Sequence, residues 1–277
     1  MISQADKARA FRALHERDQA FVIPNPWDVG TARLLADMGF EALATTSAGY
    51  AYTLGVPDMR VGRDRMLAHV AELVRATDLP VSADLENGFA DTPEGVAQTY
   101  RLASEAGLVG ASIEDSSGDA DAPIQELSRA VERVRAAVEA VRALPFPFTL
   151  TARAENHLHG RPDLVDTIRR LQAYQEAGAD VLYAPGLRTH DEIEAVVRSV
   201  DRPVNVLMGS PGISFSVADL STMGVRRISV GSAFSRAALG AFLRAGREVL
   251  EQGTFAFGAE AVGYADIGQM FAAWDRD

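Results

Sequence analysis

Apolar residues along the chain follow two alternating patterns, which predict eight short strands separated by amphipathic helices. The strand pattern is a short apolar or β-branched run bounded by Gly, Pro, Asn or Asp. It occurs at Phe21–Pro24, Glu41–Thr46, Pro80–Glu86, Val109–Glu114, Phe148–Arg153, Asp180–Pro185, Pro203–Met208 and Arg226–Gly231. Helical periodicity occurs at Asp28–Gly39, Arg63–Thr77, Thr92–Gly107, Glu126–Leu144, Asp163–Gly178, His190–Val200, Ser216–Gly224 and Ala233–Gln252. Several of these segments end in the glycine expected just past a helix C-terminus.

The regular alternation of strand and helix predicts one continuous parallel α/β domain. No linker rich in Ser or Pro interrupts the alternation, and eight such units within roughly 250 residues are typical of a (β/α)8 TIM-type barrel. A doubly wound open sheet is the alternative, but it commonly has fewer strands and a glycine-rich phosphate turn after the first one. Here NPWDVG follows the first predicted strand. We therefore expect a barrel over residues 1–252.

Residues 253–277 are predicted to form a C-terminal helical extension. Its apolar side chains are Phe257, Tyr264, Ile267, Met270, Phe271 and Trp274. An apolar helix beyond a closed barrel needs another surface to cover it. That surface is either the chain's own barrel or a neighbouring subunit, and the second case implies a homo-oligomer.

Composition and charge remove several classes of function. With 277 residues, 47% of them hydrophobic, the chain is long enough to bury a core. The net charge of −11 opposes binding to nucleic acid or to acidic membranes. The absence of cysteine excludes disulfides and cysteine nucleophiles. The only lysine, Lys7, lies in the polar N-terminal segment Ser3–Arg17, which disfavours Schiff-base and pyridoxal chemistry.

The N-terminal segment also bears on localisation. Its first residues mix both charge signs and lack an apolar core, unlike a secretion signal or a transit peptide. No apolar run approaches the roughly 20 residues that cross a membrane. We therefore expect a soluble, cytoplasmic protein.

Polar side chains gather where the predicted strands end, which is where barrel enzymes place their active sites. Asp84 and Glu86 end the third strand, and their spacing of two directs both carboxylates to one face. Glu114 ends the fourth strand and Arg153 ends the fifth. The second strand ends in TTSAGY, whose hydroxyls and small residues let backbone N–H groups approach an anion.

Several like charges at one rim require a cation. Oxygen ligands suit a hard metal ion, so Mg²⁺ is expected, with Mn²⁺ as a second possibility. Acidic residues at strand ends are often solvated or paired with arginine, but three carboxylates converging with Arg153 favour a functional site. His157 and His159 lie in the polar loop after the fifth strand, where a gating or surface role is expected rather than metal ligation. His15 and His69 are expected to be surface or helix-packing residues.

Five motifs, in this order and over most of the chain, resemble the isocitrate lyase/phosphoenolpyruvate mutase superfamily. They are NPWDVGTARLLADMGFEALATTSAGYAYTLGVPD, DLPVSADLENGF, GASIED, TARAEN and AGADVLYAP. The resemblance implies a Mg²⁺-dependent enzyme acting on a small 2-oxo acid or a 2-hydroxy di- or tricarboxylate. It also implies a barrel whose C-terminal helix is exchanged between subunits of a dimer or tetramer.

The same resemblance assigns roles to individual residues. It makes Asp84 the direct magnesium ligand, with Glu86 and Glu114 holding the coordinated waters. It places the substrate-facing acid at Asp58 and the substrate-binding arginine at Arg153. The cradle for the substrate carboxylate falls on Thr46, Ser47 and Ala48.

Departures from the family pattern favour one reaction over others. The Lys-Lys-Cys-Gly-His gate of the isocitrate and methylisocitrate lyases is replaced by SSGDADAPIQELS. The lysine- and asparagine-containing gate of the mutase and phosphonopyruvate hydrolase is also missing. Ala184, Pro185 and Gly186 stand where the mutase has its histidine. We therefore expect a lyase that cleaves a C–C bond next to an enolate-forming carbon, by oxaloacetate-like decarboxylation or by retro-aldol cleavage.

Two alternatives to this lyase stay open, as does the identity of its proton donor. The alternatives are P–C chemistry of the mutase or phosphonopyruvate hydrolase type, and non-catalytic binding of a 2-oxo acid. The proton donor to the enolate is a metal-bound water, Tyr50 or a residue of the Asp115–Ser128 gate.

Overall fold

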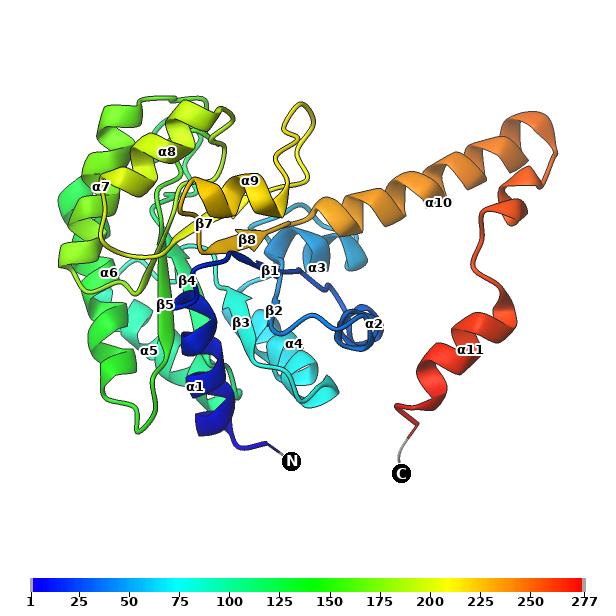
Figure 1. Ribbon diagram of the computed structural model, residues 1–277, viewed down its shortest axis with the longest axis horizontal. Coiled ribbons are helices and arrows are strands. Elements are labelled where there is room, and N and C mark those ends of the chain that lie inside the picture. Colours follow the sequence, from blue (N-terminus) through cyan, green and yellow to red (C-terminus); the bar gives the residue numbers. More distant parts are fainter. Residues whose placement is uncertain (1, 276–277) are drawn as a thin grey trace.

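The computed structural model describes residues 2–275, and its centre is a ring of eight parallel strands (Figure 1). Met1 and the last two residues of the predicted extension, Arg276 and Asp277, lie outside the described residues. The strands are β1 (Phe21–Ile23), β2 (Leu43–Ala44), β3 (Val81–Asp84), β4 (Gly110–Glu114), β5 (Thr149–Arg153), β6 (Val181–Tyr183), β7 (Val204–Leu207) and β8 (Arg227–Ser229). Each lies inside a segment predicted to be a strand.

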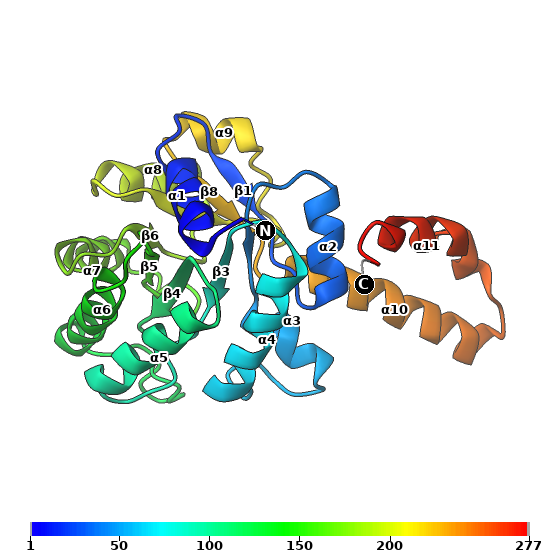
Figure 2. The ribbon, with the colours of Figure 1, turned by 90° about the horizontal axis from the view of Figure 1, so that it is seen from below.

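Helices follow the strands, and those between β1 and β8 cover the outside of this ring (Figures 1 and 2). In the described part of the chain they are α1 (Gln4–His15), α2 (Val29–Asp37), α3 (Ser47–Thr53), α4 (Arg63–Ala76), α5 (Pro93–Glu105), α6 (Leu127–Arg142), α7 (Leu164–Glu176), α8 (His190–Arg198), α9 (Val217–Thr222), α10 (Ala233–Gln252), the 3₁₀ turn η1 (Ala256–Ala259) and α11 (Tyr264–Ala272). None of them is long and apolar enough to cross a membrane.

The strand order identifies the architecture as a (β/α)8 barrel, as the sequence predicted. Strands β2 to β8 lie side by side in sequence order, each paired in parallel with the next, and β8 also pairs with β1. The remaining seam between β1 and β2 is bridged by a 3.0 Å hydrogen bond from the Ala44 N–H to the Pro24 carbonyl. Closing the sheet removes its edges and brings the carboxyl ends of all eight strands to one rim.

The first helix, α1, closes the opposite end of the barrel. Phe11 and Leu14 of α1 pack against Phe21 and Ile23 of β1 in a small apolar cluster. Although this segment is polar in composition, its buried face also takes in Lys7, whose ammonium donates a 2.9 Å hydrogen bond to the Thr77 carbonyl. The only lysine is thus buried at the base of the barrel, away from the strand ends.

His15 ends α1 at the base of the barrel and is expected to make the fold less stable in mild acid. Its ring lies 4.8 Å from that of Phe11 and 4.9 Å from that of Phe21, and burial lowers its pKa to about 3. The unfolded chain takes up this proton near pH 6.5, whereas the folded chain does not until about pH 3. Stability therefore falls as the pH falls through that window, by about 2 kcal/mol at pH 5.

The His15→Phe variant tests this expectation because its ring packs similarly but cannot bind a proton. Urea unfolding at pH 7 and pH 5 should show a smaller loss of free energy in the variant than in the wild type. An equal loss in both proteins would mean that His15 is not the responsible group.

The C-terminal arm, α10 to α11, stands away from the barrel and returns only at its tip (Figures 1 and 2). At that tip the indole N–H of Trp274 donates a 2.8 Å hydrogen bond to Asp37, the last residue of α2, and Arg33 lies over the indole ring. Elsewhere the arm exposes apolar side chains, with Phe242 72% and Tyr264 98% accessible. The chain's own barrel therefore covers only the end of the predicted extension.

Candidate active site

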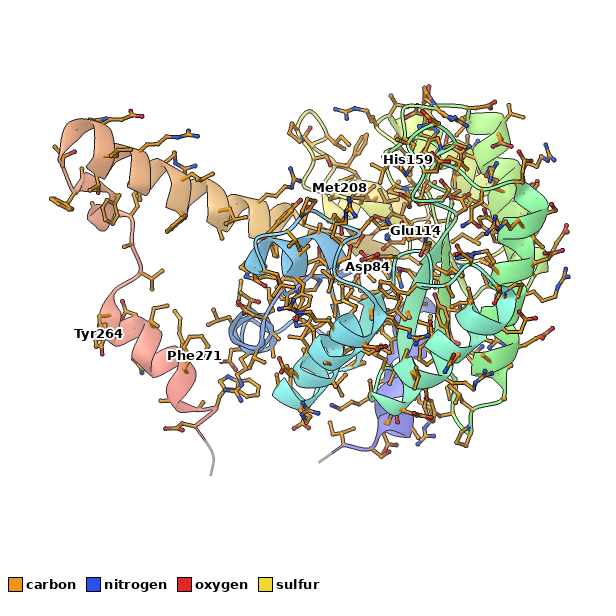
Figure 3. The ribbon with its side chains drawn as sticks, turned by 180° about the vertical axis from the view of Figure 1, so that it is seen from behind. Asp84, Glu114, His159, Met208, Tyr264 and Phe271 are labelled. Atoms are coloured by element: carbon orange, nitrogen blue, oxygen red, sulfur yellow. The ribbon has the colours of Figure 1, made fainter. Side chains whose placement is uncertain are left out.

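A cavity of about 390 Å³ opens at the carboxyl ends of the strands, and all eight strands contribute to its lining. Asp84, Glu114 and Arg153 reach it from β3, β4 and β5, the positions that the sequence predicted (Figure 3 labels the first two). Four other predicted residues also line it, namely Thr46, Ser47, Ala48 and Asp58. Two predicted residues, Glu86 and Tyr50, are not among those lining it.

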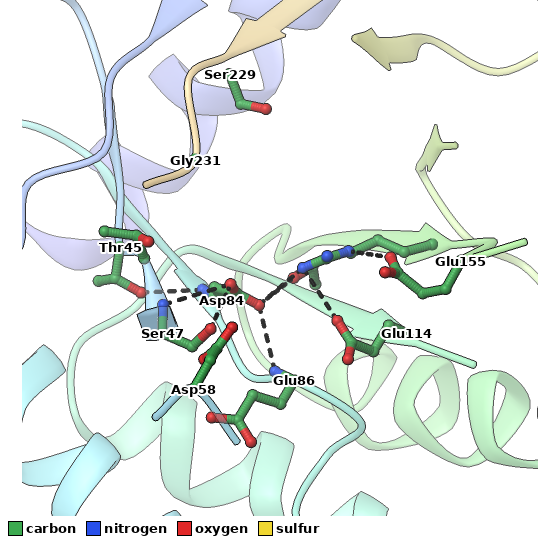
Figure 4. Close-up of polar contacts among 12 residues, drawn as sticks. Thr45, Ser47, Asp58, Asp84, Glu86, Glu114, Glu155, Ser229 and Gly231 are labelled. Carbon is green, nitrogen blue, oxygen red and sulfur yellow. Dashed lines mark hydrogen bonds and ion pairs between the residues drawn. The ribbon is translucent and has the colours of Figure 1, made fainter. Parts of the chain in front are cut away.

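Arg153 is the centre of the charged network in this cavity (Figure 4). One terminal nitrogen of its guanidinium lies 2.9 Å from Asp84 and 3.2 Å from Glu114, and its Nε lies 2.9 Å from Glu155. The register of the strands explains the convergence, since Glu114 and Arg153 are directly paired across β4 and β5. Arg153 also lies over the ring of Tyr183 on β6, 5.1 Å from its centroid.

The surroundings shift the pKa values of these groups. Burial, together with the neighbouring carboxylates, raises the pKa of Glu114 well above its usual range despite the charge of Arg153. Burial likewise raises the pKa of Glu155. Burial opposes the charge of Arg153, but the three carboxylates around it raise its pKa well above normal, so it stays protonated. One cation therefore faces three acidic side chains, and burial shifts two of them toward their protonated forms.

Asp84 is oriented by groups that follow β2. Its backbone N–H donates to the Thr45 hydroxyl at 3.0 Å, and its Oδ2 accepts hydrogen bonds from the hydroxyl and the backbone N–H of Ser47, at 3.1 and 3.4 Å. Ser47 begins α3, a helix that the sequence did not predict. Gly49 permits this turn, because a Cβ there would lie 2.5 Å from the Thr46 side chain.

Glu86 lies next to Asp84, and its backbone N–H lies 3.3 Å from the Asp84 carboxylate. It is buried, its Oε1 has no hydrogen-bond partner, and its backbone adopts a left-handed conformation with φ of +50°. Burial and the charges of Asp84 and Asp58 raise its pKa to about 8. A buried carboxyl oxygen that lacks a hydrogen-bond partner is typical of functional sites, and so is a strained backbone at the same residue.

The structure does not gather Asp84, Glu86 and Glu114 into a ready three-ligand cluster. Among residues 2–275 no three Asp, Glu or His side chains converge in that way, and Arg153 occupies the space between Asp84 and Glu114. The oxygen donors nevertheless fit a hard cation that contacts one carboxylate directly and reaches the others through water, as Mg²⁺ commonly does.

Tyr50, one of the predicted proton donors, is not brought to the cavity. Its ring stacks flat on His69, with centroids 3.6 Å apart and an angle of 3° between the planes. This contact holds α3 against α4 and makes His69 the helix-packing residue that the sequence indicated. We therefore do not carry Tyr50 forward as the proton donor.

The predicted gate, Asp115–Ser128, folds as a short hairpin beside the cavity. Ser116 and Ile124 form an antiparallel bridge, and the Ser117 N–H donates a 2.8 Å hydrogen bond to the Pro123 carbonyl. Ser116 is the gate residue found among those lining the cavity. From the next loop, His159 also lines the cavity (Figure 3), whereas His157 is not among the lining residues and has a buried, unpartnered Nε2.

Glu155 follows the fifth strand, but it was assigned no role in the site from the sequence. Its backbone N–H donates a 2.8 Å hydrogen bond to Asp115, whose other oxygen accepts from Tyr174 at 2.6 Å and from Arg170 at 3.1 Å. This buried network fixes the third carboxylate that faces Arg153.

The sequence reading missed the polar residues inside the barrel on the β6 to β8 side. They are Tyr183, Asn205, Arg227 and Ser229, together with Asn25 after β1. The alternation of Arg227 and Ser229 within RRISV is the signal that could have found them, because every second residue of a barrel strand points inward.

Comparisons with known proteins agree with this geometry. The family model described as phosphoenolpyruvate phosphomutase matches residues 11–250. A solved structure from Burkholderia cenocepacia J2315, assigned provisionally as a lyase/mutase, has a TM-score of 0.95 and 64% identity over 97% of this chain and 96% of that one. The Mycobacterium tuberculosis (strain H37Rv) protein Rv1998c is 33% identical over 244 residues, 87% of this chain and 88% of its own length. Oxaloacetate decarboxylase of Chromohalobacter salexigens is 30% identical over 245 residues, 86% of this chain and 83% of the enzyme.

Proposed function

Since the chain belongs to the phosphoenolpyruvate mutase/isocitrate lyase superfamily of enzymes, we propose that it is a magnesium-dependent carbon–carbon lyase. Its substrate is a small 2-oxo or 2-hydroxy carboxylic acid, cleaved next to the carbon that becomes an enolate. The observation that carries this proposal is Arg153, a buried guanidinium held by three carboxylates at the barrel rim. The similarity to an oxaloacetate decarboxylase supports lyase chemistry in general without naming the substrate.

The residues of the chain account for binding and for charge stabilisation. Backbone N–H groups at Ser47 and the hydroxyl of Thr46 offer donors to the substrate's 2-carboxylate. Arg153 orients the adjacent oxygen and stabilises the negative charge that develops there. When the C–C bond breaks, its electron pair enters the enolate of one fragment, which then takes up a proton. With a 2-hydroxy acid, the hydroxyl of the other fragment loses its proton and becomes a carbonyl.

Asp84 would hold the Mg²⁺ ion directly, while Glu86 and Glu114 would hold its coordinated waters. The unpartnered oxygen of Glu86 and the three acidic side chains gathered around Arg153 support this assignment. When bound, the ion would act as a Lewis acid toward the enolate oxygen. Asp58, at the mouth of the same cavity, is the proposed substrate-facing acid.

A substrate panel tests the proposed function. Metal-stripped protein would be incubated with and without Mg²⁺ against oxaloacetate, isocitrate, methylisocitrate, phosphonopyruvate and branched 2-oxo or 2-hydroxy acids, with products followed by NMR. Mg²⁺-dependent C–C cleavage is expected. Turnover of phosphonopyruvate alone would instead indicate P–C chemistry, and tight Mg²⁺-dependent binding without any product would indicate a binding protein.

The arm formed by α10 and α11 is proposed to pack on a second copy of the chain, as an exchanged element of a dimer or tetramer. Its accessible apolar side chains support this, because an isolated monomer would leave them in water. Deleting residues 257–277 is therefore expected to lower the solution mass measured by light scattering.

A pair of point variants provides the matched control for this deletion. Phe242→Ser removes an exposed apolar side chain from the arm, whereas Val165→Ser removes one from α7, on the barrel. Only the first should weaken association. An unchanged mass in both the deletion and Phe242→Ser would refute the exchange.

A further inference from the structure

Arg227 is a buried cation inside the barrel that lacks an acidic partner. It begins β8, is 6% accessible and lines the same cavity as Arg153. Its Nε donates a 2.9 Å hydrogen bond to the side-chain oxygen of Asn205, while its Nη1 is buried with no hydrogen-bond partner. Across residues 2–275, no carboxylate forms an ion pair with it.

Other buried arginines of this chain have more acceptors within the fold. Arg153 faces three carboxylates, and Arg170 pairs with Asp115 and Asp166. Within the described residues Arg133 has no acidic partner and its Nε is unpartnered, but it donates to two backbone carbonyls of the loop after β3. Arg227 has one neutral acceptor. An unpaired buried charge is costly for the fold, so its retention at the cavity wall calls for an anion supplied from outside.

The charge persists at neutral pH. Burial lowers the pKa of Arg227 to about 10, and the positive charge of Arg153 contributes to that lowering, so the guanidinium stays protonated. Its neighbours are neutral groups that can share a bound anion. The Asn205 amide donates to the Ser229 hydroxyl at 2.9 Å, and Tyr183, whose ring lies under Arg153, lines the same cavity.

The cavity thus has two cationic sides with different chemistry. On the β3 to β5 side the charge of Arg153 is balanced by the acidic side chains around it, which suits a metal ion and an enolate. On the β7 and β8 side the charge of Arg227 is not neutralised, which suits an anionic group of the ligand. One small molecule in a cavity of about 390 Å³ can reach both sides.

We propose that Arg227, with Asn205 and Ser229, binds a second carboxylate of the substrate. This inference rests on the proposed function at Arg153 and narrows its substrate to a dicarboxylate. The planar fork of a guanidinium matches two carboxylate oxygens, and the neutral amide and hydroxyl add hydrogen bonds without competing charge.

The assignment has a consequence for the reaction. Arg227 stabilises the charge of the carboxylate that it holds, and that charge would have to disappear if the group left as CO₂. Binding the ground state in this way raises the barrier to decarboxylation. The second carboxylate therefore stays on the departing fragment, as in retro-aldol cleavage. Efficient Mg²⁺-dependent release of CO₂ from oxaloacetate by the wild-type protein would contradict this consequence.

The test uses ligand pairs that differ only in a terminal carboxylate or methyl group. They are 2-oxoglutarate against 2-oxopentanoate, and oxaloacetate against 2-oxobutyrate, titrated calorimetrically in the presence of Mg²⁺. Wild-type protein should bind the carboxylate member of at least one pair roughly 10- to 100-fold more tightly. Arg227→Gln should abolish this preference and leave the affinity for the methyl member unchanged.

Matched variants separate binding from folding. Arg226→Gln makes the same change one residue earlier, where the side chain donates to the Asp18 carbonyl outside the cavity, and should keep the wild-type preference. Arg227→Lys keeps a charge but not the planar fork, and it should give an intermediate preference. This variant serves as the test if Arg227→Gln does not fold.

Each outcome separates this inference from the proposed function. Equal affinities within both pairs in the wild type would overturn the Arg227 site while leaving a 2-oxo acid site in place. Tighter binding of phosphonopyruvate than of either dicarboxylate would overturn the choice of a carboxylate. Binding of neither member would overturn the proposed function as well.

Discussion

Replacing Asp84 with asparagine is expected to lower kcat/KM by at least about 10³-fold, the largest loss that any conservative change in this protein should produce. The substitution keeps an oxygen that can accept from Ser47 but removes the charge that faces Arg153 at 2.9 Å. It also removes the carboxylate proposed to contact Mg²⁺ directly. A Lewis-acid contribution of roughly 4 kcal/mol to the transition state corresponds to this loss in rate.

The fold should tolerate this change. Three carboxylates crowd one guanidinium in the wild type, so Glu114 and Glu155 still neutralise Arg153 in the variant. The melting temperature of the metal-free protein is therefore expected to stay within a few degrees of the wild type. The stabilisation that Mg²⁺ gives the wild type should disappear, since an ion stabilises only the state that binds it.

Asp180→Asn is the matched control for Asp84→Asn. Asp180 is also a partly buried carboxylate, paired with Arg142 at 2.5 Å and accepting the Leu150 N–H, but it lies at the opposite end of the barrel. Its replacement should reduce stability and leave Mg²⁺-dependent turnover in place. More than a tenth of wild-type activity in Asp84→Asn would remove Asp84 from the metal site.

The barrel could be predicted from the sequence because each of its strands and most of its helices are marked by a local pattern of apolar residues. Each strand is a short apolar run between turn residues, and each helix repeats its apolar positions over several turns. The observed strands, such as β3 (Val81–Asp84), lie inside the predicted Pro80–Glu86 and are shorter, because the pattern cannot show where pairing stops. The short helix α3 was missed because its seven residues span only about two turns, too few to show helical periodicity, and because it depends on Gly49 packing against Thr46.

The site was predicted where its residues stand at strand ends, and missed where they stand inside the ring. Asp84, Glu114 and Arg153 each end a strand, so register alone brings them together. Tyr50 was adjacent to the site in sequence, but helix α3 turns its ring onto His69. Arg227 begins a strand, and only the closed barrel shows that its long side chain reaches the shared cavity. Strand order around the ring is a long-range property that no single motif contains.

Replacing Arg153 should lower both stability and activity. The loss of stability should depend on whether the new residue carries a charge, whereas activity should fall in either case. Arg153→Met leaves Asp84, Glu114 and Glu155 facing one another without a cation. Removing one partner from such a buried network typically costs about 3–5 kcal/mol. Arg153→Lys retains the charge, so urea unfolding should show a markedly smaller loss of stability. Lysine cannot reproduce the contacts that Arg153 makes from two separate nitrogens, because its ammonium is a compact charge rather than a planar fork.

Activity should fall in both Arg153 variants, because the guanidinium geometry orients the substrate as well as balancing charge. We expect Arg153→Lys to lose roughly 10²- to 10³-fold in kcat/KM, and Arg153→Met more than that. Arg142→Met removes another ion-paired arginine, at the far end of the barrel, and should leave kcat/KM unchanged. If Arg153→Lys kept wild-type kcat/KM, the site would need only a positive charge at this position. Arg153 would then be a structural counter-ion, and the enolate would have to be stabilised by other groups of the cavity.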